Sequence, residues 1–356
     1  LFSSESDGAL AVTAGSFANS FIDASITARS PLTGNRFVTL SGGVVLDKGT
    51  TVTIGETQAT KQAFQQFGNE FTGSVLSVLA KDGNPAFLEI QNRALGVLYG
   101  SSITETSGRV ALLSILDSRV IGPGSTSAEG RQPGDVPPLL ELYALDNNLQ
   151  PTGTAPRVDV TSAVVVRSSN ISGLDGALLE ASSPILAIAY GNMTTKSHFA
   201  DFNTNGRTAL RANVPGDALV RLDRNSTLTV NGNLLHLTNG SSASVNGTLF
   251  SIANGSTLNL NGVLFSLAGN SVLRLTGNAF GVFGDGTNTL RIANTLCAGE
   301  CGVLTDHNGA VFQWENRPIK VSGVGPAKVA LPQEFLPLRA LNGTPQHFVL
   351  PEQAAL

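Results

Sequence analysis

The 356-residue chain contains few charged residues, since Asp, Glu, Lys and Arg make up only 13% of it. This is about half of the usual share in soluble domains. The 26 acidic residues outnumber the 22 Lys and Arg residues, which gives a formal net charge of −4 at pH 7. Nucleic-acid binding needs a basic surface that neutralises phosphates. The composition therefore argues against a nucleic-acid partner.

Long hydrophobic runs are also missing. No apolar stretch approaches the ~20 residues of a membrane-spanning helix, so we expect no membrane insertion. The opening residues, LFSSESDGAL, begin without Met and lack the charged and then apolar regions of a signal peptide. We therefore expect the chain to be a processed or trimmed product.

Cysteine is scarce, with only Cys297 and Cys301 in the segment CAGEC. The two thiols are close enough in sequence to form a disulfide within one tight loop, which would indicate an oxidising compartment. The alternative is a pair of reduced thiols. A zinc site is disfavoured because two thiols supply only half of the ligands that a tetrahedral site needs.

Catalytic and cofactor motifs are absent from the sequence. The four histidines are scattered at His198, His236, His307 and His347, and no GxSxG, HExxH or P-loop pattern occurs. We therefore predict that the chain is not an enzyme and binds no cofactor.

One segment partly matches a calcium-binding loop. Asp201–Arg207, DFNTNGR, places Asp, Asn, Asn and Gly at positions 1, 3, 5 and 6 of an EF-hand loop. Position 12 is Ala212, where a bidentate Glu is required. We therefore interpret the segment as an Asn-rich turn and predict no metal site.

What the chain has in abundance is repetition. Shifting the sequence by 15 residues aligns four units, 226–240, 241–255, 256–270 and 271–285. Every unit begins with Ser, has Gly at its seventh position, and contains two short alternating segments separated by Asn-Gly-type turns. Alternation of this kind predicts β-strands.

Two β arrangements can be built from these units. An antiparallel meander with two-residue turns pairs Leu235 with Ser244, so the apolar face turns to serine. A longer irregular loop at every second turn would rescue it. A parallel solenoid, in which each residue stacks on the one 15 positions later, keeps every apolar column inside. We favour the solenoid, with His236 pointing to solvent and with a core ladder of Leu228, Val230, Leu235, Leu237, Phe250, Ile252, Phe265, Leu267, Phe280 and Val282.

Weaker echoes of the unit extend upstream. The predicted fold is all-β: a right-handed parallel β-helix with 15-residue coils in the C-terminal half, longer decorated coils upstream and one short helix. Residues 1–121 form a β-rich region with the helix near 57–67, and 122–138 form a Gly/Pro-rich loop. The strands around this loop could belong to one body. The solenoid follows at 139–317, and the Pro-rich residues 318–356 form an extended arm that wraps its own body or reaches a neighbour.

Over residues 218–285, the run LTVNGNLLHLTNGSSASVNGTLFSIANGSTLNLNGVLFSLAGNSVLRLTG resembles the repeat tracts of bacterial surface and secreted β-solenoid proteins, including filamentous-haemagglutinin-like adhesins. The coil length differs from that family. The resemblance implies export, adhesion or surface assembly, and it carries no catalytic residues to transfer.

The functional prediction is a non-enzymatic structural protein, extracellular or at the cell surface, that assembles with copies of itself into a filament, sheath or surface layer. A surface glycan or host ligand is a further candidate partner, and a monomeric adhesin is a related option. The alternative is a carbohydrate-binding or carbohydrate-active β-helix of the tailspike kind. Its acidic groups would come from upstream coils, at Asp159, Asp175, Glu180, Asp201, Asp217 and Asp223.

Overall fold

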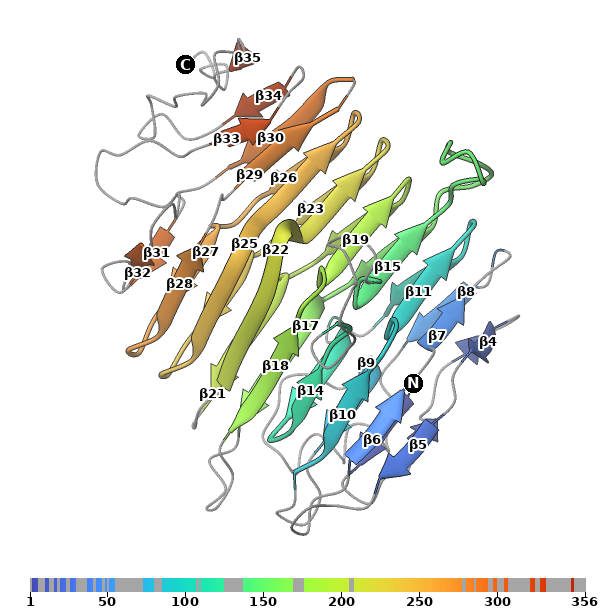
Figure 1. The fold of residues 1–356 in the computed structure, drawn as a ribbon, viewed down its shortest axis with the longest axis vertical. Coiled ribbons are helices and arrows are strands. Elements are labelled where there is room, and N and C mark those ends of the chain that lie inside the picture. The colour runs from blue at the N-terminus through green and yellow to red at the C-terminus, as the bar shows by residue number, and fades with distance from the viewer. Residues whose placement is uncertain are drawn as a thin grey trace.

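The computed structural model is an all-β solenoid whose strands stack along one long axis (Figure 1). No helix occurs in the part of the chain that the structure describes. That part comprises residues 2–5, 10–12, 16–17, 20–23, 26–29, 37–40, 43–46, 49, 51–54, 73–79, 85–106, 108, 110–124, 137–168, 176–204, 208–276, 280–284, 286–293, 297–299, 304–306, 321–323, 327–330 and 347–348.

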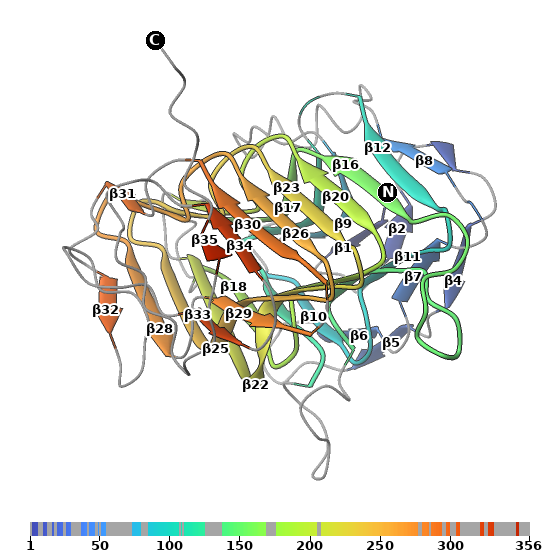
Figure 2. The same cartoon turned by 90° about the horizontal axis from the view of Figure 1, so that it is seen from above.

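Each turn contributes strands to three sheets, which we call A, B and C (Figure 2). Sheet C receives two neighbouring stretches from every turn, whereas sheets A and B receive one each. Along the chain, a turn therefore runs through sheet C twice, then through sheet B, then through sheet A. The sheets follow the hydrophobic alternation of the sequence, because successive side chains of a strand point to opposite faces.

The strands of the main turns, in chain order, are β6 (Phe37–Leu40), β7 (Gly43–Leu46), β8 (Thr51–Ile54), β9 (Gly73–Leu79), β10 (Phe87–Ile90), β11 (Leu95–Leu98), β12 (Ser102–Glu105), β13 (Val110–Leu116), β14 (Arg119–Ile121), β15 (Leu140–Tyr143), β16 (Arg157–Val160), β17 (Ser162–Ser168), β18 (Ala177–Ala181), β19 (Leu186–Ala189), β20 (Asn192–Thr195), β21 (Ala200–Thr204), β22 (Thr208–Asp223), β23 (Thr227–Val230), β24 (Leu235–Leu237), β25 (Ser242–Ala253), β26 (Thr257–Leu260), β27 (Phe265–Leu267), β28 (Val272–Thr276), β29 (Phe280–Phe283), β30 (Asn288–Ile292) and β31 (Cys297–Gly299). The long strands β22 and β25 each cross both stretches of sheet C.

The pairing between turns is parallel, as the sequence predicts, but its register is twice the predicted one. Thr227 pairs with Thr257, and Phe250 pairs with Phe280, so equivalent residues lie 30 positions apart. The expected 15-residue coil is therefore wrong, and so is the expectation that Phe265 lies over Phe250. Phe265 instead pairs with Leu235 on sheet A, whereas Phe250 belongs to sheet C.

The physical reason is that one 15-residue unit covers only half of a turn. Its two short strands form one side of the solenoid, and a second unit is needed to bring the chain round the core. Units 226–240 and 256–270 supply sheets B and A, whereas 241–255 and 271–285 supply sheet C. Both halves need the same apolar columns and corners, so their sequences repeat at 15 although the structure repeats at 30.

The predicted core residues do line the interior. Nine of the ten are fully buried, and they belong to one continuous apolar core: Leu228, Val230, Leu235, Leu237, Phe250, Ile252, Phe265, Leu267 and Phe280. The tenth, Val282, pairs in register with Ile252. Burial of each such side chain contributes about 1.5–3 kcal/mol, so the stack of turns, rather than any single turn, stabilises the solenoid.

The serines that begin each unit close the corners. Ser226, Ser241, Ser256 and Ser271 are all fully buried. The Ser226 hydroxyl donates to the Ile188 carbonyl at 3.0 Å and accepts from the Tyr190 N–H at 2.9 Å. Asn residues precede the corners with positive φ, as in Asn239 (54°) and Asn254 (51°). Asn tolerates this left-handed conformation better than other non-Gly residues.

Upstream turns are longer, as predicted. Arg119 on β14 pairs with Leu178 on β18, so this turn is nearly twice as long as the 30-residue turns. Strands before residue 121 and after residue 139 belong to the same three sheets. The predicted helix near 57–67 and most of the 122–138 loop lie outside the described residues, and the predicted right-handed winding stays a prediction.

The two ends of the solenoid are built differently. At the N-terminal end, three short strands lie antiparallel on the first turn: β3 on β8, β4 on β7 and β5 on β6. At the C-terminal end, short strands continue the parallel direction. The end strands are β1 (Phe2–Glu5), β2 (Leu10–Val12), β3 (Ser16–Phe17), β4 (Ser20–Asp23), β5 (Ile26–Arg29), β32 (Leu304–Asp306), β33 (Val321–Gly323), β34 (Ala327–Ala330) and β35 (His347–Phe348).

Candidate functional site

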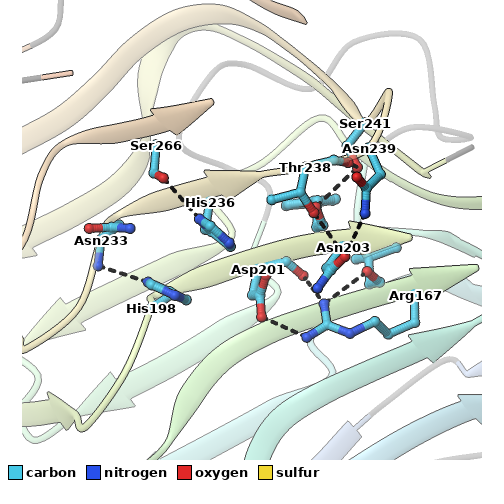
Figure 3. Close-up of polar contacts among 12 residues, drawn as sticks. Arg167, His198, Asp201, Asn203, Asn233, His236, Thr238, Asn239, Ser241 and Ser266 are labelled. Carbon is cyan, nitrogen blue, oxygen red and sulfur yellow. Dashed lines mark hydrogen bonds and ion pairs between the residues drawn. The ribbon is translucent and has the colours of Figure 1, made fainter. Parts of the chain in front are cut away.

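The most concentrated group of polar side chains lies on the outer face of sheet A (Figure 3). It consists of Arg167 on β17, Asp201 on β21, His236 on β24 and His198, which precedes β21. Asp201 pairs with Val165 below it and with His236 above it. The solenoid thus brings residues 31 to 38 positions apart onto adjacent strands. We call these four residues the polar row.

Arg167 and Asp201 form the buried end of the polar row. The Arg167 Nη2 atom donates to Asp201 Oδ2 at 2.6 Å, and Nη1 donates to the Asp201 carbonyl at 3.2 Å. Both side chains are less than 10% exposed. Two buried charges need each other, because removal of either would leave the other without compensation. The second carboxylate oxygen, Oδ1, is buried with no hydrogen-bond partner among the described residues.

The two imidazoles stack on each other at the half-buried end of the row. Their ring centroids are 4.4 Å apart with an interplanar angle of 17°. The Asn233 N–H donates to His198 Nδ1 at 2.9 Å, and His236 Nδ1 lies 3.0 Å from the Ser266 hydroxyl. His236 therefore lies on the outer side of the sheet, as predicted, but it is packed against a neighbour and not free in solvent.

The surroundings favour neutral imidazoles. Burial lowers the pKa of both His198 and His236, and the neighbouring His236 lowers the pKa of His198 further. Arg167 acts in the same direction, whereas Asp201 opposes it. A neutral His198 that accepts at Nδ1 carries its proton on Nε2.

The chemistry available to this row is limited. Among the described residues, the imidazole hydrogen bonds go to Asn233 and Ser266, and Asp201 is bound by Arg167. A nucleophilic triad needs a carboxylate that orients the imidazole and a hydroxyl within reach of its other nitrogen. The geometry is instead that of a polar ladder that joins adjacent turns.

Asparagine ladders support the same interpretation. Asn203 Oδ1 accepts from Thr238 Oγ1 at 2.8 Å, at the corner beside the polar row (Figure 3). Asn261 donates its amide to Asn231 at 2.8 Å. Asn246 donates to Asn213, also at 2.8 Å. The prediction that Asn stacks over Asn along the axis is therefore confirmed, at the longer register.

A second polar group ties the end of sheet B together. The fully buried Glu105 carboxylate lies 2.7 Å from Lys196 Nζ, which also approaches Asp159 at 3.7 Å. The hydrogen bond from Glu105 raises the pKa of Lys196, although burial opposes this effect. Glu105 pairs with Ile54, so this carboxylate occupies a column that is otherwise mostly apolar.

The carboxylates of the carbohydrate-active alternative are spread over all three sheets. Asp159 lies on sheet B, Asp201 on sheet A, and the other three described ones, Glu180, Asp217 and Asp223, on sheet C. Each of the five has a Lys or Arg partner within 4 Å. Asp175 lies outside the described residues. Glycoside hydrolysis needs two carboxyl groups that flank one bond, and this distribution does not supply such a pair among the five.

The remaining sequence candidates have mixed outcomes. Asp201 and Asn203 lie on β21 and contact Arg167 and Thr238. No group of three or more metal-ligating His, Cys, Asp or Glu side chains occurs within the described ranges. Cys297 begins β31, but Cys301 lies outside the described residues, so the disulfide stays a prediction.

A membrane-spanning helix is likewise not found in the described part of the chain. Comparisons with protein-family models, curated proteins and solved structures found no match to this chain. The β-solenoid architecture therefore stands on the structure, and the resemblance to filamentous-haemagglutinin-like adhesins stays a prediction.

Sequence reasoning did not find the polar row. Arg167 gave no signal, and His198 and His236 looked unrelated because they are separated by 38 positions. Their contact depends on a turn of 35 residues between Asn192 and Thr227, which the 15-residue pattern does not predict. The only available signal was that both histidines lie near strand segments with the same cadence.

Proposed function

We propose that this protein is a non-enzymatic structural subunit, extracellular or at the cell surface, that assembles end to end with copies of itself into a filament, sheath or surface layer. The observation that carries the proposal is the construction of the C-terminal end. All three sheets arrive there as parallel strands, and β31, β32, β33 and β35 are the last strands within the described part of the chain.

Edge strands of this kind present backbone N–H and C=O groups that pair readily with a further strand. The N-terminal end offers different strands, β2 to β5, which lie antiparallel on the body. Contact between two unlike ends is heterologous, and a heterologous contact that does not close into a ring gives an open fibre. The unlike ends thus favour filaments over closed dimers.

Three further features support a structural role. The segment from Ser226 to Gly284 contains Arg274 as its only formally charged residue, so stacked turns do not repeat like charges. Its corners and Asn ladders are built of hydrogen bonds between turns. The five described upstream carboxylates are all engaged in ion pairs.

Electron microscopy of the purified protein tests the proposal. We expect fibres or lattices whose amount rises with protein concentration. Isolated rods at every concentration would contradict it, because the ends would then be closed to other copies.

Deletion of residues 318–356, which include β33, β34 and β35, tests which segment makes the contact. We expect this variant to keep its β-sheet circular dichroism but to lose fibres. Undiminished fibres would remove the C-terminal segment from the mechanism. A glycan array on the full chain tests the adhesin alternative independently of assembly.

A further inference from the structure

The outer face of sheet B carries two parallel files of short polar side chains. Strands β20, β23 and β26 are consecutive in this sheet, and their outward positions alternate with buried ones. In-register pairing places Asn192, Thr227 and Thr257 in one file. The second file holds Thr194, Thr229 and Asn259. We call these six residues the threonine face.

The threonine face continues beyond these three strands. Thr289 on β30 extends the first file upward. On the earlier strands β8 and β12, the same two files hold Thr51 with Ser102 and Thr53 with Thr104. The files are interrupted at β16 by Arg157 and Asp159.

Threonine has a high preference for β-strands, so exposed threonines alone would need no functional reason. The internal repeat provides a comparison that removes this explanation. In unit 241–255, which has the same pattern but lies on sheet C, the positions equivalent to Thr227 and Thr229 are Ser242 and Ser244. Threonine therefore follows the face of the solenoid and not the repeat.

The other faces also differ in charge. The outer side of sheet C carries ion pairs such as Arg211–Glu180 and Arg221–Asp217, and sheet A carries Arg167–Asp201. The six residues of the threonine face include no charged and no aromatic side chain. This face is thus a neutral surface of methyl, hydroxyl and amide groups with a fixed repeat.

The repeat has two dimensions. Neighbouring strands lie about 4.8 Å apart, and two residues along a strand span about 6.6 Å. Oxygen atoms on the faces of hexagonal ice repeat at intervals close to the first distance and slightly longer than the second. A threonine supplies a hydroxyl that joins such a lattice and a methyl group around which water orders.

We propose that the threonine face binds ordered water and, through it, the surface of ice crystals. A neutral lattice is the occupant that fits a neutral, aromatic-free, periodic face, because charged side chains would hold their own hydration shells. This binding is independent of the proposed assembly, although a filament would multiply the face along its length.

Two matched variants test the proposal. Thr229→Glu places a charge at the centre of the threonine face. Ser244→Glu places the same charge at the equivalent position of the repeat on sheet C, where Arg211 and Arg274 are its in-register neighbours. Both positions are outside the core, and circular dichroism checks that both variants fold.

The measurements are ice-crystal shaping and inhibition of ice recrystallisation by the full chain. We expect the wild type and Ser244→Glu to shape ice and slow recrystallisation, and Thr229→Glu to lose both effects. Asn259→Thr, which completes the second file, should strengthen them. A folded wild type without effect on ice overturns the proposal, and so does an equal loss in Ser244→Glu. Retention on crystalline cellulose or chitin without any effect on ice would assign the face to a polysaccharide and also overturn it.

Discussion

Phe250 lies directly under Phe280 in the core, with ring centroids 5.8 Å apart and planes 11° from parallel. The two residues are 30 positions apart and belong to adjacent strands of sheet C. Phe265, midway between them in sequence, lies on sheet A instead. This relationship sets the length of the turn and identifies the 15-residue unit as half of it.

The Phe250 side chain should therefore be a major contributor to stability. Phe250→Ala removes a fully buried ring and its stacking partner, and we expect the free energy of unfolding to fall by about 3–5 kcal/mol. Denaturant titration followed by circular dichroism measures the change. Phe250→Leu, which keeps most of the apolar volume, is the control and should cost clearly less. A loss below about 1 kcal/mol for the alanine variant would contradict the packing described.

The corner serines give a prediction about hydrogen bonding. Ser226→Ala leaves the buried N–H of Tyr190 without its acceptor, and we expect a loss of about 1–3 kcal/mol. Ser242→Ala is the matched control, because Ser242 is only partly buried and faces outward on β25. Equal unfolding free energies for the two variants would mean that the corner hydroxyl does not stabilise the turn.

The close approach of backbones at the corners makes a glycine indispensable. A Cβ atom at Gly262 would lie 2.2 Å from the Gly232 carbonyl oxygen. We expect Gly262→Ala to lower the thermal midpoint strongly, since backbone atoms must shift to relieve the clash. At Gly96 a Cβ atom would meet only the flexible Arg93 side chain, at 3.3 Å, so Gly96→Ala should leave the midpoint nearly unchanged. Similar midpoints would contradict the corner geometry.

The stacked imidazoles predict a pH dependence. Their pKa values in the folded chain lie below the value of about 6.5 for an unfolded histidine. As the pH falls below about 6.5, the unfolded chain therefore takes up protons first. The stabilisation is complete above that pH and is lost as the pH falls through the folded-state pKa values.

The experiment compares the unfolding free energy of the wild type and His236→Gln between pH 8 and pH 5. We expect the wild type to lose more stability on acidification than the variant, because the variant lacks one of the two stacked titrating groups. Arg167 and Asp201 face the pair in both proteins, so their effects are largely shared. Parallel pH profiles would show that the stack does not couple to folding.

The sequence predicted the parallel arrangement for a sound physical reason. A meander would have turned Leu235 towards Ser244, whereas stacking in parallel kept every apolar column inside. It did not predict the turn length, because both halves of a turn must meet the same demands at Phe250 and Phe265. A weak signal was present: the triplet Ser-Thr-Leu occurs at 226 and again at 256, but not at 241.

The polar row was beyond sequence reasoning for a related cause. Upstream turns have unequal lengths, so the partner of Asp201 or His198 cannot be found by counting. The stacking of His198 and His236 follows only from the register of β21 and β24. Repeats predict contacts where the period is constant, and they fail where insertions change it.

The most direct test of the account is cross-linking between turns. In a Cys297→Ser, Cys301→Ser background, cysteines at positions 227 and 257 occupy partnered sites on adjacent strands, whose spacing of about 4.8 Å suits a disulfide. Cysteines at 227 and 242 lie on different sheets. We predict that mild oxidation cross-links the first pair rapidly and the second pair not at all. Efficient cross-linking of 227 to 242, without cross-linking of 227 to 257, would contradict the 30-residue turn.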